Sequence, residues 1–83
     1  MIFLLQYDRK KGAIRKLKSF PAEERAEAQR ERLAIELDLR KSRVLHEVVL
    51  LEAGDEQTLR RTHQRYFKSP RELVELMMMI PTR

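Results

Sequence analysis

The chain has 83 residues, of which 42% are hydrophobic and 37% charged, and its formal net charge at pH 7 is +5. This length suits one domain with a thin core, and the apolar content excludes an intrinsically disordered chain. The absence of cysteine excludes a disulfide scaffold, a thiolate metal site and cysteine nucleophile chemistry. No apolar run approaches the ~20 residues of a membrane span, and the order of apolar and basic residues at the N-terminus is not that of a signal peptide. We therefore expect a single cytoplasmic domain over residues 1–83.

The first predicted elements form a β-hairpin. Residues 2–7, IFLLQY, are almost all apolar or aromatic, which indicates a strand buried on both faces. Residues 8–12 predict a turn with Gly12 at positive φ. Residues 13–20 alternate poorly between apolar and polar side chains, so we predict an edge strand with a bulge, on which Lys and Arg discourage pairing with another sheet.

A long helix is predicted next, from about Pro21 to about Lys41. Its first position is proline, its first turn is acidic and its last turn is basic, as the helix dipole favours. Two apolar stripes, roughly 150° apart, run along it. The stripe expected to face the sheet consists of Ala22, Ala26, Leu33 and Leu37. The second stripe, Ala28, Ile35 and Leu39, is either the rim of the core or a contact with another subunit.

The rest of the chain predicts a third strand and two further helices. Residues 43–52, RVLHEVVLLE, carry apolar side chains on both faces, and Asp55 then caps a helix over residues 56–67. Ser69 begins a capping box that starts a last helix. The order β-β-α-β-α-α predicts an α+β two-layer domain. We expect a three-stranded antiparallel sheet in the order 2-1-3 with helices on one face.

The excess positive charge lies in the hairpin. Residues 8–18 hold six bases and one acid, whereas the bases and acids balance in residues 19–46 and again in residues 47–83. A basic β-ribbon can follow the phosphates of DNA or RNA, which gives affinity without sequence preference. The alternative is that these cations only protect a sheet edge. The candidate nucleic-acid contacts are Arg9, Lys10, Lys11, Arg15, Lys16 and Lys18.

A second candidate site lies in residues 61–66. His63 can titrate near neutral pH, and Tyr66 follows three residues later on the same side of a helix. With Arg61 and Arg65 beside them, these side chains could hold an anionic small molecule or form a small active site. The alternative is that both rings pack in the core.

The sequence contains no metal or cofactor motif. The two histidines, His46 and His63, have only Glu47 beside them, which is no metal signature. Whether the two histidines face each other depends on the tertiary fold. We expect a non-catalytic protein without a cofactor or metal.

Self-association is the remaining hypothesis. Three consecutive methionines in the C-terminal LVELMMMI cannot share one face of a helix, and Met is common at partner surfaces. The predicted homo-oligomer interface combines this tail with the second helical stripe, through Ile35, Leu39, Met77 and Met78. We rank nucleic-acid binding first, self-association second, and a ligand-binding or active site third.

Overall fold

The structure is a computed structural model that describes residues 1–68 and Met78. Its elements in chain order are β1 (Ile2–Asp8), β2 (Ala13–Phe20), the 3-10 helix η1 (Ala22–Glu24), α1 (Arg25–Ser42), β3 (His46–Glu52), α2 (Glu56–Thr62) and α3 (Gln64–Phe67). The helix predicted from Ser69 falls outside the described residues, except for Met78, which is helical and exposed. In the part of the chain that the structure describes, no helix is long and apolar enough to cross a bilayer.

The sheet has the predicted topology. Its three strands run antiparallel in the order β2-β1-β3, so β1 is central. Because both faces of a central strand are covered, the apolar run Ile2–Leu5 is buried throughout. The predicted bulge is also present. Gln6 pairs with Lys16 but Tyr7 pairs with Ile14, which leaves Arg15 as the extra residue of β2.

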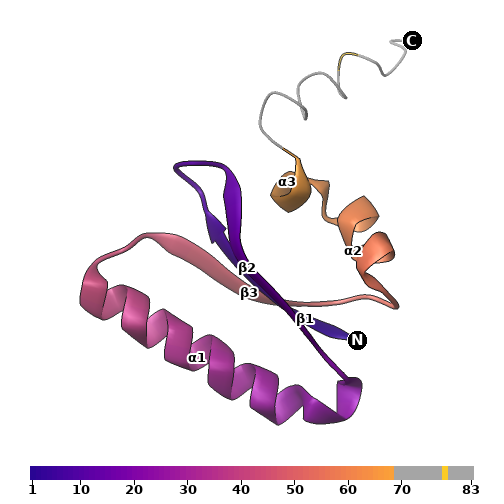
Figure 1. Cartoon of the computed structure of the whole chain (residues 1–83), viewed down its shortest axis with the longest axis horizontal. Helices are drawn as coiled ribbons and strands as arrows, with labels where there is room; N and C mark the ends of the chain where they lie inside the picture. Colours follow the sequence, from indigo (N-terminus) through magenta and orange to yellow (C-terminus); the bar gives the residue numbers. More distant parts are fainter. Residues whose placement is uncertain (69–77, 79–83) are drawn as a thin grey trace.

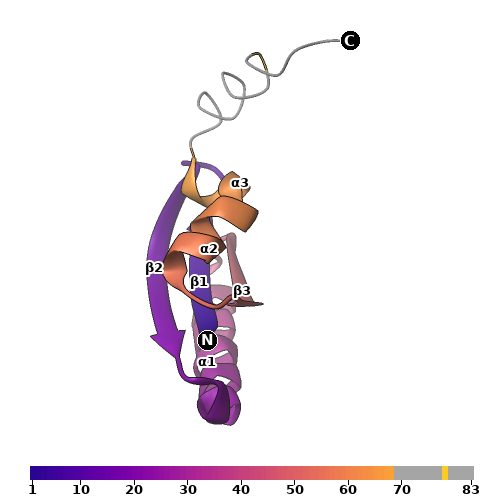
Figure 2. The same cartoon turned by 90° about the vertical axis from the view of Figure 1, so that its right-hand side faces the viewer.

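Helices cover both faces of the sheet, so the prediction of helices on one face was wrong. In Figures 1 and 2, α1 lies against one face, and α2 and α3 lie against the other. The core accordingly has two parts. Ile2, Leu4, Phe20, Ala28 and Val48 form the part under α1, and Leu5, Tyr7 and Tyr66 form the part under α3. Successive side chains of a strand point to opposite faces, and β1 is apolar on both, so each face needs a cover.

The α1 stripe predicted to face the sheet is exposed, and the second stripe lies at the rim of the core, which was one of its two alternatives. Ala28 is buried and Ile35 and Leu39 pack on the core, whereas Leu33 and Leu37 are 52% and 49% exposed. Ile35 and Leu39 therefore belong to the core and do not form a free interface. The rotation of α1 that buries them also brings Glu31 to the lysines of β2. Both stripes are apolar, so hydrophobicity alone does not select the rotation.

Local backbone geometry sets several element ends. Arg43 has φ 55° and ψ 37°, and this left-handed residue ends α1. As a result β3 starts at His46, later than the predicted residue 43. The predicted helix over residues 56–67 is divided at His63, whose φ is −123° and ψ 51°. The predicted cap is confirmed, because Asp55 accepts a hydrogen bond from the N–H of Thr58 at 2.7 Å.

Candidate nucleic-acid interface

The turn between β1 and β2 is built around the buried carboxylate of Asp8. One of its oxygens accepts hydrogen bonds from the backbone N–H groups of Lys10 (3.0 Å) and Lys11 (3.1 Å). Gly12 donates to the Asp8 carbonyl at 2.8 Å and has a φ of 64°, as predicted. The Lys11 backbone bond is the main cause that lowers the pKa of Asp8. The turn therefore holds its two lysine side chains outward on a fixed backbone.

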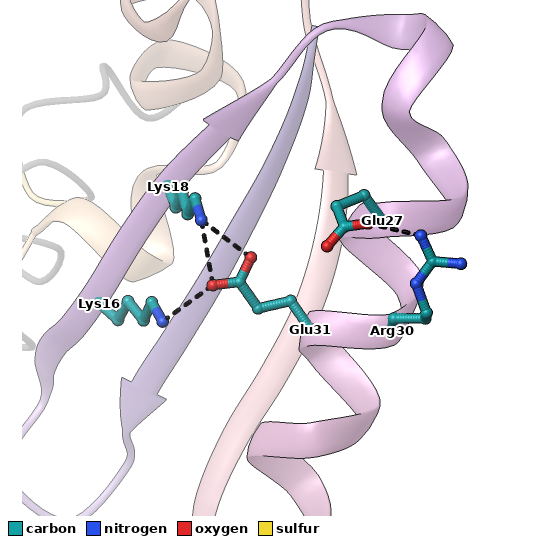
Figure 3. Close-up of polar contacts among 5 residues, drawn as sticks. All are labelled: Lys16, Lys18, Glu27, Arg30 and Glu31. Atoms are coloured by element: carbon teal, nitrogen blue, oxygen red, sulfur yellow. Dashed lines mark hydrogen bonds and ion pairs between the residues drawn. The ribbon is translucent and has the colours of Figure 1, made fainter.

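Two of the six hairpin cations are occupied within the protein. The Nζ atoms of Lys16 and Lys18 lie 3.3 Å and 3.0 Å from the carboxylate of Glu31, which reaches across from α1 (Figure 3). Lys18 also lies over the ring of Phe20, 5.0 Å from its centroid. The bond from Lys18, reinforced by Lys16, lowers the pKa of Glu31. These two lysines pair α1 with β2, so a ligand must compete with Glu31 for them.

Arg9 is also paired, with Glu47 of β3. Its Nε lies 3.5 Å from the carboxylate. Glu47 in addition accepts hydrogen bonds from the Tyr66 hydroxyl at 3.0 Å and from Arg65 at 2.7 and 2.9 Å. Burial alone would raise the pKa of Glu47, but the Tyr66 hydroxyl and the two arginines outweigh it, so the pKa is lowered. Glu47 thus joins the hairpin, β3 and α3.

Three hairpin cations remain. Lys10, Lys11 and Arg15 are exposed. Within the part of the chain that the structure describes, none of them forms an ion pair with a carboxylate. Arg15 is the extra residue of the bulge, and bulges re-aim side chains relative to the regular strand. These three side chains can therefore meet a ligand without breaking an ion pair in the described part of the chain.

An open groove of about 710 Å³ adjoins the turn. It lies between the hairpin and the loop from α1 to β3. Its walls contain cations from both sides, Lys10 from the turn and Arg43 from the loop, and the apolar side chains of Val44 and Leu45. Leu45 is 90% exposed. The remaining lining residues are Asp8, Arg9, His46 and Glu47.

The two acids of this groove are already satisfied by internal partners. Asp8 accepts the turn N–H groups and lies 3.5 Å from the Nε2 atom of His46, while Glu47 holds Tyr66 and Arg65. The other ring nitrogen of His46 lies 2.8 Å from the side-chain nitrogen of Gln6. Because both ring nitrogens of His46 are engaged, this histidine has no free nitrogen for a reacting group.

The residues of the second candidate site do not converge on one ligand. Tyr66 is buried against Tyr7, with ring centroids 5.2 Å apart, and Arg65 stacks over Tyr66 at 4.5 Å. Burial and the bond to Glu47 raise the pKa of Tyr66. Arg61 is exposed on α2. The position of Tyr66 agrees with the alternative that its ring packs in the core.

The two histidines lie on opposite sides of the sheet. The side chain of His46 contacts Gln6 on the α1 face of the sheet, where Val48 of the same strand also packs. His63 lies between α2 and α3, and its Nδ1 atom is 3.0 Å from the Thr62 hydroxyl. Among the described residues, no group of three or more His, Asp or Glu side chains is arranged to hold a metal ion.

Sequence reasoning missed the partners that sort the hairpin cations. Glu31 and Glu47 lie 13 or more positions from the cations that they bind, and only the tertiary structure joins them. The six candidate contacts also leave out Arg43, which lines the groove. Comparison with known protein families, curated proteins and solved structures finds no match for this chain.

Proposed function

We propose that this protein is a non-catalytic binding module that contacts the phosphates of nucleic acid through the turn of its basic hairpin. The contacting side chains are Lys10 and Lys11 of the turn, Arg15 of the bulge and Arg43 across the groove. The observation that carries the proposal is that the first three are exposed and make no ion pair in the described part of the chain, although carboxylates hold their neighbours.

The position of Arg43 supports the same function. A residue other than glycine at positive φ carries a steric cost, and helices commonly end in glycine at this position. Here an arginine occupies it, and this residue lines the groove on the side opposite Lys10. The arginine at this position therefore adds positive charge to the groove, at a cost in backbone energy.

Edge protection accounts for a different subset of the cations. Lys16 and Lys18 lie on the regular part of the edge strand β2 and are bound to Glu31. Charged side chains on such a strand discourage pairing with a second sheet. The turn residues Lys10 and Lys11 lie beyond the paired part of the strands, where no edge needs protection. The two explanations thus apply to different residues of one hairpin.

The test is binding of labelled single-stranded and duplex DNA and RNA, followed by fluorescence anisotropy over a series of salt concentrations. Four phosphate contacts predict a slope of log affinity against log salt of about −3.6 on duplex DNA and about −2.8 on single strands. The double variant Lys10→Gln/Lys11→Gln should make the duplex slope shallower by about 1.8, because it removes two phosphate contacts.

The matched control is Lys16→Gln/Lys18→Gln. It removes the same charge from the same hairpin, but from lysines that Glu31 already holds, so its salt slope should equal that of the unaltered protein. Equal losses of slope in both variants would refute the assignment to the turn. Absence of binding to all four nucleic acids at ~50 mM salt, where such contacts are strong, would refute the function itself.

A further inference from the structure

The outer edge of β3 is open in the described part of the chain. β3 is a terminal strand of the sheet, and of the described elements only β1 pairs with it. The opposite edge strand, β2, carries a bulge and basic side chains, which are the usual devices against edge pairing. β3 has neither. Its sequence HEVVLLE contains no Lys, Arg or Pro, and its register with β1 is regular. A regular, unprotected edge of this kind is a template for another strand.

The hydrogen bonds at the end of β3 show which of its backbone groups point outward. Met1 and Ala53 exchange two bonds, with Ala53 donating at 3.2 Å and the Met1 amine donating at 3.0 Å. In an antiparallel ladder such hydrogen-bonded pairs recur at every second residue. Leu51, Val49 and Glu47 therefore point their N–H and C=O groups toward β1. The groups that point outward belong to His46, Val48, Leu50 and Glu52.

We propose that a second copy of this chain occupies this edge, with β3 pairing antiparallel to its own counterpart about a two-fold axis at Val49. The two sheets then form one continuous sheet of strand order β2-β1-β3-β3-β1-β2. Val48 of each copy pairs with Leu50 of the other, and His46 with Glu52. Each such hydrogen-bonded pair exchanges two bonds, so the four pairs supply about eight. This function in assembly is independent of nucleic-acid binding.

The register follows from the geometry of the strand. Residues directly opposite in a sheet share a face, so the two-fold axis must pass through a residue and not between two. Val49 is the middle residue of the strand His46–Glu52, and only an axis at Val49 uses every outward-pointing backbone group. An axis at Val49 places Glu52 opposite His46 and Glu47 opposite Leu51, so no two acids lie opposite each other.

The surroundings of the edge are compatible with a second copy. A shallow groove of about 270 Å³ runs between α1 and β3 beside the edge. On its α1 side lie one acid and one base, Glu36 and Arg40, so like charges do not dominate this side. Val44 and Leu45, both exposed, lie at its end. On the other face α3 packs on β2 and is bonded to β3 through Tyr66 and Arg65, which donate to Glu47.

Single-cysteine variants test this register, because the natural sequence has no cysteine. With the axis at Val49, the two introduced thiols of Val49→Cys lie directly opposite each other in a non-hydrogen-bonded pair. Their Cα atoms are then about 4.5 Å apart, within the range for a disulfide. The matched control is Leu51→Cys, on the same face of the same strand. Its two thiols are four residues out of register, about 13 Å apart, too far for a disulfide.

Two measurements decide the proposal. Sedimentation equilibrium of the unaltered protein should give twice the chain mass of 10.0 kDa, and with oxidised glutathione Val49→Cys should cross-link about tenfold or more faster than Leu51→Cys, since the dimer raises the effective concentration of its thiols. A monomeric mass at every accessible concentration would overturn the proposal. This is also the result expected if other residues of the same chain cover the edge. A dimer in which Val49→Cys cross-links no faster than Leu51→Cys would overturn it too, because the interface would then lie elsewhere.

Discussion

The hydroxyl of Tyr66 donates a hydrogen bond to the carboxylate of Glu47 over 3.0 Å, and this bond ties the four-residue helix α3 to β3. A helix this short has little stability of its own. Its position depends on Tyr66, which is buried against Tyr7 and bonded to Glu47, and on Arg65, which bonds to the same carboxylate. The carboxylate of Glu47 therefore holds α3 against the sheet through two side chains of this helix.

Replacing Tyr66 by Phe should lower the free energy of unfolding by about 1 kcal/mol, because the change removes one hydrogen bond and keeps the ring. Urea denaturation measures this. Tyr7→Phe is the control, since in the described part of the chain the Tyr7 hydroxyl makes no hydrogen bond, and its effect should stay within about 0.5 kcal/mol. Equal effects of the two variants would show that the bond to Glu47 does not stabilise the fold.

The rotation of α1 predicts opposite results for two neighbouring residues. Ile35→Ala should cost about 2 kcal/mol, at the low end for a core truncation, because Ile35 packs on the core but is only partly buried. Leu37→Ala should change stability by no more than about 0.5 kcal/mol, because Leu37 is half exposed. Chemical denaturation of both variants gives the comparison. A larger loss for Leu37→Ala would mean that α1 packs through its other stripe.

Acid should destabilise the protein through its paired carboxyls. The pKa values of Asp8, Glu31, Glu47 and Asp55 are lower in the folded state than their ordinary values near 4. As pH falls, the unfolded chain therefore takes up protons first, and the equilibrium shifts toward it. The stabilisation is complete above about pH 5 and is lost as pH falls through the folded-state pKa values.

Thermal melts between pH 7 and pH 2 measure this dependence. The melting temperature should be nearly constant with respect to these carboxyls above about pH 5 and should decrease below it. The melting temperature of Glu31→Gln should decrease less steeply as pH falls, because this variant has no carboxylate at position 31 whose protonation weakens the pairs with Lys16 and Lys18. Glu23→Gln, an exposed position without an ion pair in the described part of the chain, should follow the unaltered protein. A parallel course for Glu31→Gln would contradict the role of its lysine pairs.

Arg43 predicts opposite changes in stability and in binding. Arg43→Gly should raise the free energy of unfolding by about 1 kcal/mol, because glycine adopts positive φ without a steric cost. The same variant should weaken nucleic-acid binding and make the salt slope shallower by about 0.9 on duplex DNA. Arg43→Ala should weaken binding equally without the gain in stability. Unchanged binding in both variants would remove Arg43 from the proposed interface.

The sequence of this protein determined its strands, their order and the turn chemistry. The apolar run of β1, the glycine at positive φ, the bulge in the basic strand and the Asp55 cap all follow from local residue patterns. Such features depend on neighbours along the chain, and backbone sterics and side-chain alternation fix them. The antiparallel order followed because short connections leave few ways to arrange three strands.

Only the tertiary structure decided which stripe of α1 is buried, that α2 and α3 cover the second face, and which cations are free. Both stripes are apolar, so composition alone does not decide which of them is buried, and the observed rotation also pairs Glu31 with Lys16 and Lys18. The same long-range pairs separate the cations held by Glu31 and Glu47 from those of the turn. Their partners are distant in sequence, and charge pairing between distant residues leaves no periodic signal in the chain.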